Sequence, residues 1–72
     1  MKMEYAFYTE QTYTSSGVVE ARVLTAAEAA ELGYEDGMAF QGQNGKVFID
    51  GFSSEKSACH WLSDLHNCEV LN

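Results

Sequence analysis

The sequence predicts an α+β fold: a four-stranded antiparallel sheet in the order ββαββα, with the helices packed on one face. Three observations carry this prediction. Residues 3–13 alternate between two faces, two segments begin with helix-capping residues, and Asn44-Gly45 marks a hairpin turn. The length of 72 residues indicates a single domain, residues 1–72. A short last strand after the second helix is an alternative ending to this order.

The first two strands form a predicted hairpin. The first strand is half-buried, because its side chains alternate with the period of a strand. Thr14 to Gly17 is typical of a turn, and Val18 to Leu24 is the second strand. We expect the odd-numbered face of the first strand to be buried. The odd positions are Met3, Tyr5, Phe7, Thr9, Gln11 and Tyr13, and the even ones are Glu4, Ala6, Tyr8, Glu10 and Thr12.

The first helix begins at a capping box. The Thr25 hydroxyl can accept from the Glu28 amide, while the Glu28 carboxylate can accept from the Thr25 amide. An alanine-rich run leads to Leu32, and Gly33 is placed to end the helix in a left-handed conformation. A helix of about two turns needs tertiary contacts to be stable. An acidic turn follows at residues 34–37.

Asn44-Gly45 predicts a two-residue hairpin loop, because both residues tolerate positive φ. This loop would pair Gln43 with Lys46 and Phe40 with Ile49. One face of the second hairpin would then carry Met38, Phe40, Val47 and Ile49, and the other Ala39, Gln41, Phe48 and Asp50.

The main helix is predicted over residues 54–67, with Ser53 or Ser54 as its cap. Its apolar stripe repeats at i, i+3, i+4 and i+7. Cys68 to Leu71 would form the short closing strand. The stripe consists of Ala58, Trp61, Leu62 and Leu65.

The net charge of −7, from eleven acidic and four basic residues, narrows the class of partner. Direct binding of nucleic acid needs clustered Lys or Arg, and an anionic membrane surface is disfavoured for the same reason. No stretch approaches the roughly 18 consecutive apolar residues of a membrane span. A protein or ribonucleoprotein with a basic surface would be attracted. The alternative is that the acidity only keeps a small protein in solution.

The candidate partner-binding site is a group of carboxylates around the first helix. They would imitate a row of phosphates toward a basic partner, or they would form an ordinary solvated surface. Several aromatic residues outside the predicted core are candidate interface anchors or fill the edges of a thin core. The site comprises Glu28, Glu31, Glu35 and Asp36, extended across an open sheet face by Glu4, Tyr8 and Glu10. The aromatic residues are Tyr8, Tyr13, Tyr34, Phe48 and Phe52.

A metal site and an enzyme are the less favoured alternatives. Four potential zinc ligands, Cys59, His60, His66 and Cys68, fall within ten residues. No pair of them has the i, i+3 or i, i+4 spacing that brings two ligands to one ion on a helix. We therefore expect no metal, no cofactor, two reduced thiols and no catalytic residues.

The stretch Val47 to Glu55, followed by Trp61-Leu62, is a strand, a Ser-Ser-Glu helix start and an aromatic-aliphatic pair. It resembles the same stretch in small anti-CRISPR proteins of phages and in the arm-type DNA-binding domain of phage integrases. The integrase pattern is basic, whereas Asp50 and Glu55 are acidic here, which favours the anti-CRISPR group. The resemblance implies a non-enzymatic protein that occupies a surface of a larger host complex.

These observations together lead to one main functional expectation. The chain would be a small acidic phage or prophage protein, in the host cytoplasm, that binds and inhibits a nucleic-acid-handling complex. The alternative is a structural or homo-oligomeric accessory protein with no inhibitory role, and a homodimer is compatible with either.

Overall fold

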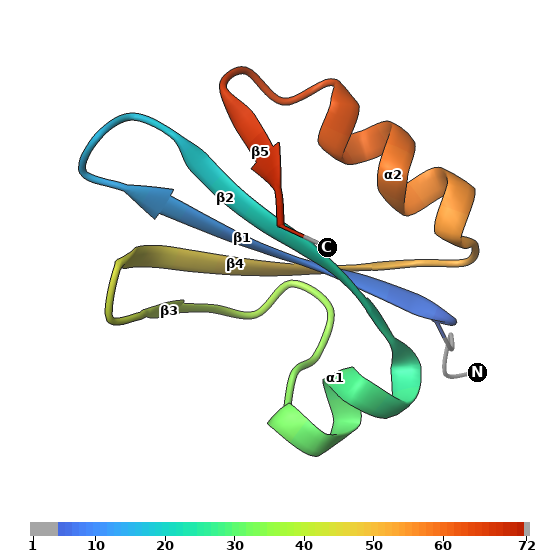
Figure 1. Ribbon diagram of the computed structural model, residues 1–72. Helices are drawn as coiled ribbons and strands as arrows, with labels where there is room; N and C mark the ends of the chain where they lie inside the picture. Colours follow the sequence, from blue (N-terminus) through green and yellow to red (C-terminus); the bar gives the residue numbers. More distant parts are fainter. Residues whose placement is uncertain (1–4, 72) are drawn as a thin grey trace.

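A long antiparallel hairpin forms the centre of the sheet in the computed structural model, which describes residues 5–71 (Figure 1). Strand β1 (Phe7–Thr14) pairs with β2 (Val19–Thr25) in a register that places Tyr13 opposite Val19. The alternation of the first strand and the turn signal at Gly17 therefore predicted this hairpin correctly. Of the residues on the two predicted faces of β1, Met3 and Glu4 lie outside the described range.

The sheet contains five strands in the order β3-β4-β1-β2-β5. Strand β4 (Gly45–Phe52) lies antiparallel to β1, and β3 (Ala39–Gln41) lies antiparallel to β4 on the outer side. The short last strand is present as β5 (Cys68–Val70), which pairs parallel to β2. The α+β class is confirmed, whereas the expected four-stranded antiparallel sheet is in fact a five-stranded mixed one.

The parallel strand follows from the path of helix α2 (Glu55–Ser63). Strands β4 and β2 run in the same direction, because each is antiparallel to β1. The chain leaves β4, crosses the sheet as α2 and returns as β5 beside β2, which is a crossover connection between parallel strands. Local sequence patterns do not show at which border of a sheet a returning chain adds its strand.

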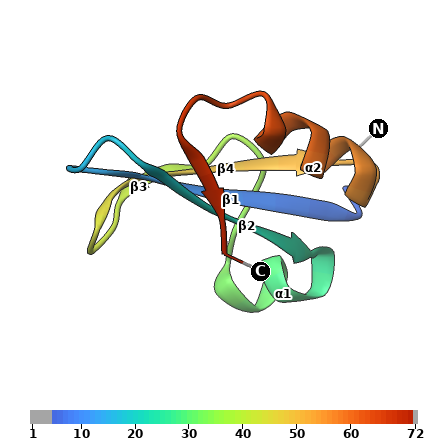
Figure 2. The same cartoon turned by 45° about the horizontal axis from the view of Figure 1, so that its top comes forward.

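The helices lie on opposite faces of the sheet, so the prediction of one shared face is wrong (Figure 2). On the odd-numbered face of β1, Trp61 of α2 contacts Phe52 of β4. On the even-numbered face, the segment after helix α1 (Ala26–Leu32) covers Glu10 with Tyr34. Both faces carry apolar side chains that need a cover: Val19 and Ala21 on the odd face, and Leu24, Val47 and Ile49 on the even face.

Two local predictions need smaller corrections. Helix α2 ends at Ser63 rather than Asn67, with Asp64 as its C-cap. In the second hairpin, residues 42–44 separate the two strands, and Gly42 N donates to Gly45 O at 2.8 Å across this turn. Its register is shifted by two residues from the predicted one, so that Phe40 faces Val47. A shift of two residues leaves every side chain on its predicted face.

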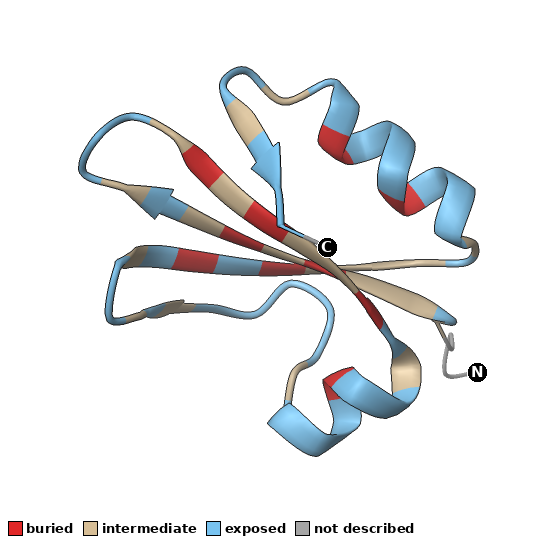
Figure 3. Ribbon diagram, viewed as in Figure 1, coloured by how far each residue is buried: buried red, intermediate tan, exposed pale blue. Residues whose placement is uncertain are grey.

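Buried residues gather on the central strands and on one side of α2 (Figure 3). Ala58 and Leu62 of α2 are buried, as the apolar stripe predicted, while Trp61 remains 40% exposed. Under α2 the two buried side chains of β1 are polar. The Gln11 side-chain amide donates to Thr9 Oγ1 and to Asp50 Oδ2, which satisfies polar groups that would otherwise be costly to bury.

Candidate protein-docking surface

Four exposed carboxylates stand on α1 and the turn that follows it. We call this group, Glu28, Glu31, Glu35 and Asp36, the acidic lobe. Helix α1 begins directly at the end of β2, so the lobe projects from one end of the central hairpin (Figure 1). Residues 23–45 contain no Lys, Arg or His. The segment that carries the lobe therefore holds no cation to neutralise it.

Internal hydrogen bonds fix two of the four carboxylates. Glu28 Oε1 accepts from the Thr25 amide at 2.9 Å, and the Thr25 hydroxyl accepts from the Glu28 amide, so the predicted capping box is present. The bond from the Thr25 backbone lowers the pKa of Glu28. Asp36 Oδ1 accepts from the Gly51 amide at 2.8 Å, which ties the acidic turn to β4. Both carboxylates remain exposed.

The other two carboxylates take no part in folding contacts. Glu31 and Glu35 are exposed, and neither side chain makes a hydrogen bond or an ion pair with any residue in the range 5–71. Two apolar side chains accompany them: Leu32 is 51% exposed and Met38 is 38% exposed. Exposed apolar side chains among charges are common at protein interfaces, where they contribute most once water is excluded. The acidic lobe thus combines free charge with apolar contact area.

Glu10 is not part of this surface, because its half-buried carboxylate is engaged by Arg22 and Tyr34. Arg22 binds its carboxylate with two nitrogens, at 2.8 Å and 2.9 Å, and the Tyr34 hydroxyl donates to Oε2 at 2.5 Å. Burial by itself raises the pKa of Glu10, but these hydrogen bonds and the charge of Arg22 outweigh it and lower the pKa. Burial and the same carboxylate raise the pKa of Tyr34 to about 12.

The expected extension of the site across an open sheet face does not form, since α1 and Tyr34 cover that face. Tyr8 is half-buried and meets Tyr5 edge to face, with ring centroids 6.0 Å apart. Glu4 lies outside the described residues. The hairpin register contained the missing signal: once the turn is placed at Gly17, Glu10 lies opposite Arg22, and opposite charges on facing strand positions attract.

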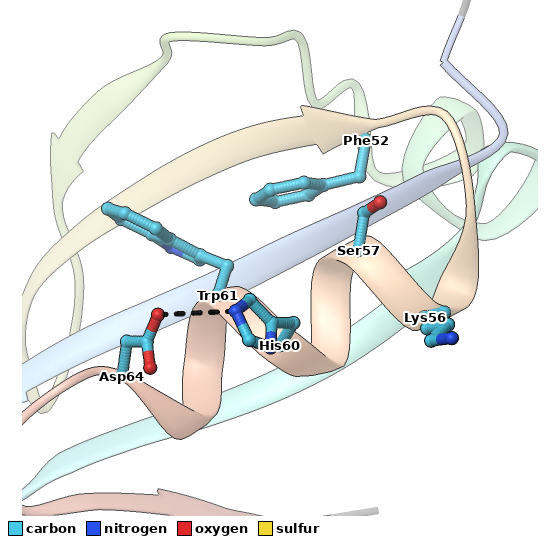
Figure 4. A pocket seen from close by; sticks show the side chains of 6 residues that line it. All are labelled: Phe52, Lys56, Ser57, His60, Trp61 and Asp64. Atoms are coloured by element: carbon cyan, nitrogen blue, oxygen red, sulfur yellow. Dashed lines mark ion pairs between the residues drawn. The ribbon is translucent and has the colours of Figure 1, made fainter.

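A second surface runs along α2 on the other face of the sheet. Phe52 and Trp61 lie with ring centroids 6.4 Å apart beside a groove of about 390 Å³ (Figure 4). His60 Nε2 lies 3.6 Å from Asp64 Oδ2 at this groove. The sequence pattern assigned Trp61 to the core and missed its exposure. The groove is lined by Phe52, Lys56, Ser57, His60, Trp61 and Asp64.

Another aromatic pair lies further along the same face. Tyr13 and Phe48 meet edge to face at 5.3 Å and are 43% and 37% exposed. Of the aromatic residues that the predicted core did not include, Tyr34 packs against Phe40 and only Tyr13 and Phe48 are classed as exposed. This pair therefore offers apolar contact area away from the acidic lobe.

The cysteines and histidines do not gather into a ligand set. Within residues 5–71 no three His, Cys, Asp or Glu side chains are placed to hold a metal ion. Cys59 is exposed and Cys68 is half-buried, both as free thiols, and burial raises the pKa of Cys68. No helix in that part of the chain is both long enough and apolar enough to cross a membrane.

Comparison of the chain with protein-family models, with curated proteins and with solved structures found no match. We therefore infer function from the surfaces of the chain itself.

Proposed function

We propose that this chain is a non-enzymatic docking module that binds and inhibits a nucleic-acid-handling complex. The acidic lobe would contact Lys and Arg residues that otherwise hold phosphates. One observation carries the proposal: the side chains of Glu31 and Glu35 have no hydrogen-bond or ion-pair partner among residues 5–71, and they stand beside the exposed Leu32 in a segment free of cations. Folding does not explain carboxylates so placed, because neighbouring like charges repel.

The mechanism is occupation of a surface. Clustered carboxylates attract a basic partner over a distance of about one Debye length, roughly 8–10 Å at physiological salt, and speed its capture. Leu32 and Met38 then contribute apolar contact that does not depend on salt. Nucleic acid is excluded because the Lys and Arg residues of the partner that would bind its phosphates already contact the acidic lobe. The sequence resemblance to phage anti-CRISPR proteins agrees with this role and suggests a phage or prophage protein acting in the cytoplasm of its host.

Capture from a nuclease-treated bacterial lysate tests the proposal. The wild-type chain should retain one stoichiometric protein that normally binds DNA or RNA. The double charge reversal Glu31→Lys and Glu35→Lys should lose it, since both side chains are exposed and free of folding contacts. The matched control, Asp64→Lys with Glu69→Lys, changes the net charge equally at exposed positions outside the lobe. Equal retention by both double variants would refute the acidic lobe as the binding surface.

A structural or homo-oligomeric role is the second candidate. The exposed aromatic pairs Tyr13–Phe48 and Phe52–Trp61 favour it, because large aromatic side chains at the surface are frequent interface anchors. Such a protein would self-associate and retain nothing from the lysate, whereas the inhibitor retains its target even when it is monomeric.

A further inference from the structure

Strand β3 forms one border of the sheet, and its outer side is unpaired among residues 5–71 (Figure 1). Ile49 N donates to Met38 O, and Gly42 N donates to Gly45 O, each at 2.8 Å. Phe40, between them, faces Val47. Backbone groups of a strand point alternately to its two sides. Ala39 and Gln41 consequently direct their N–H and C=O groups away from the sheet.

This part of the border lacks the features that normally protect an edge strand. Natural edges carry charged side chains, proline or a covering segment, because open N–H and C=O groups recruit another strand. Further along the border, the Asp36 carboxylate blocks the Gly51 amide. The opposite border has Glu69 within β5. Strand β3 itself, Ala39-Phe40-Gln41, has neither charge nor proline.

Exposed apolar groups flank the unprotected strand on both faces. Ala39 faces Phe48 in the sheet, and Phe48 meets Tyr13, so an exposed aromatic pair lies next to the edge. Met38, which immediately precedes β3, is 38% exposed. A strand added at this edge would cover apolar area as well as form backbone hydrogen bonds.

The charges around β3 differ between its two ends. The acidic residues Glu35 and Asp36 precede the strand, and Lys46 follows the loop after it. Antiparallel pairing with an identical strand brings the acidic end of each copy to the lysine end of the other. Parallel pairing would place the acidic ends together. Charge complementarity thus selects an antiparallel second copy as the occupant of this edge.

We propose that β3 pairs antiparallel with β3 of a second copy of this chain, about a twofold axis near Phe40. The pairing joins the two sheets into one continuous sheet and is self-complementary, as a twofold interface requires. A three-residue strand buries less than a standard interface, so the dimer is weak, with a Kd on the order of 100 μM. The dimer edge shares Glu35 and Met38 with the proposed docking surface, whereas Glu31 and Leu32 lie outside β3 and the residues flanking it, and Ala39 and Val70 belong to neither the acidic lobe nor its apolar contacts. Ala39→Pro therefore tests the dimer separately from partner capture.

Sedimentation velocity from about 5 to about 500 μM tests the proposal, since this range brackets the expected Kd. Wild type should shift from monomer to dimer. Ala39→Pro should stay monomeric throughout, because it removes an outward N–H and leaves the internal ladder intact. The matched control is Val70→Pro at the other border. Leu71 N donates to Ala21 O and Val19 N to Asn67 O, so Val70 also directs its N–H outward. Val70→Pro should dimerise like wild type.

Charge variants provide a second readout that needs no proline. Lys46→Glu should weaken the dimer at least severalfold, and adding Glu35→Lys should restore it, because the swap recreates opposite charges across the interface. Amide exchange should slow at Ala39 and Gln41 as the concentration rises. A monomer at every concentration would overturn the proposal. So would a dimer lost in Val70→Pro and kept in Ala39→Pro, or amide protection confined to β5.

Discussion

Glu10 is the residue that joins the hairpin to the segment above it. Its carboxylate accepts from Arg22 of the facing strand and from Tyr34 of the α1–β3 segment, while its side chain is only 15% exposed. Charge-assisted hydrogen bonds of this kind are among the stronger side-chain contacts. The even face of the sheet is therefore closed by a polar contact rather than by apolar packing alone.

Replacing this carboxylate gives the first stability prediction. Glu10→Gln should lower the free energy of unfolding by about 1–3 kcal/mol at pH 7, because Arg22 and Tyr34 lose a charged acceptor. The pKa of Glu10 is lowered in the folded state, so its contribution is fully present above the unfolded value of 4.5 and is lost progressively as the pH falls from there through the lower folded-state pKa.

Urea denaturation at pH 7 and pH 3 measures both effects. The difference in stability between the wild type and Glu10→Gln should be smaller at pH 3 than at pH 7. Tyr34→Phe serves as the control, because it removes one donor and leaves the Arg22 pair intact. An equal difference between wild type and Glu10→Gln at both pH values would contradict the assignment.

At the scale of elements, α2 has a buried side and an exposed aromatic side. Leu62 is 1% exposed, whereas Trp61 beside it is 40% exposed. Truncating a buried Leu to Ala typically lowers the free energy of unfolding by about 2–5 kcal/mol. This loss is comparable with the whole stability of a domain this small, roughly 3–5 kcal/mol. Two neighbouring residues of one helix should therefore behave very differently.

Leu62→Ala should unfold most of the protein at 25 °C, and Trp61→Ala should keep a cooperative thermal transition and lose at most about 2 kcal/mol. Far-UV circular dichroism during thermal unfolding distinguishes the two. If Trp61→Ala destabilised the chain as strongly as Leu62→Ala, the exposed aromatic side of α2 would belong to the core instead of to a contact surface.

The elements also show which structural features local sequence patterns predict and which they do not. Thr25, Glu28 and Gly33 marked α1 correctly, because capping is decided by residues within one turn of each other. The face that each helix covers was predicted wrongly, since both sheet faces carry apolar residues and local pattern does not choose between them. Thr9 and Gln11 fit the predicted buried face, yet Asp50, which accepts a hydrogen bond from Gln11, lies 39 positions away in the sequence.

Within the candidate site, too, some features could be recognised from the local sequence and others depended on distant parts of the chain. Glu31 and Glu35 were recognisable as a free acidic group because their helix and turn form locally. Glu10 was misassigned to the surface, because its role depends on Tyr34, which lies 24 positions away and reaches it only once α1 covers the sheet. The free edge of β3 was also hidden, since the strand order is a property of the complete sheet.

For the whole molecule, charge and packing separate onto different sides. The acidic lobe stands on the α1 side without a cation in its own segment, and Arg22, the nearest base in the sheet, is paired with Glu10. The described lysines, Lys46 and Lys56, belong to β4 and α2. A net charge of −7 on a domain this small then presents its least compensated part at the lobe, which is where a basic partner should dock.

Competition between this chain and nucleic acid for the captured partner tests the central claim most directly. The purified chain is immobilised with its partner bound, and a DNA or RNA oligonucleotide is added in increasing amounts at low salt. We expect mutually exclusive binding: the oligonucleotide should displace the partner from the immobilised chain in proportion to the amount added. A stable ternary complex of chain, partner and oligonucleotide would contradict it, because the acidic lobe would then not occupy the nucleic-acid surface.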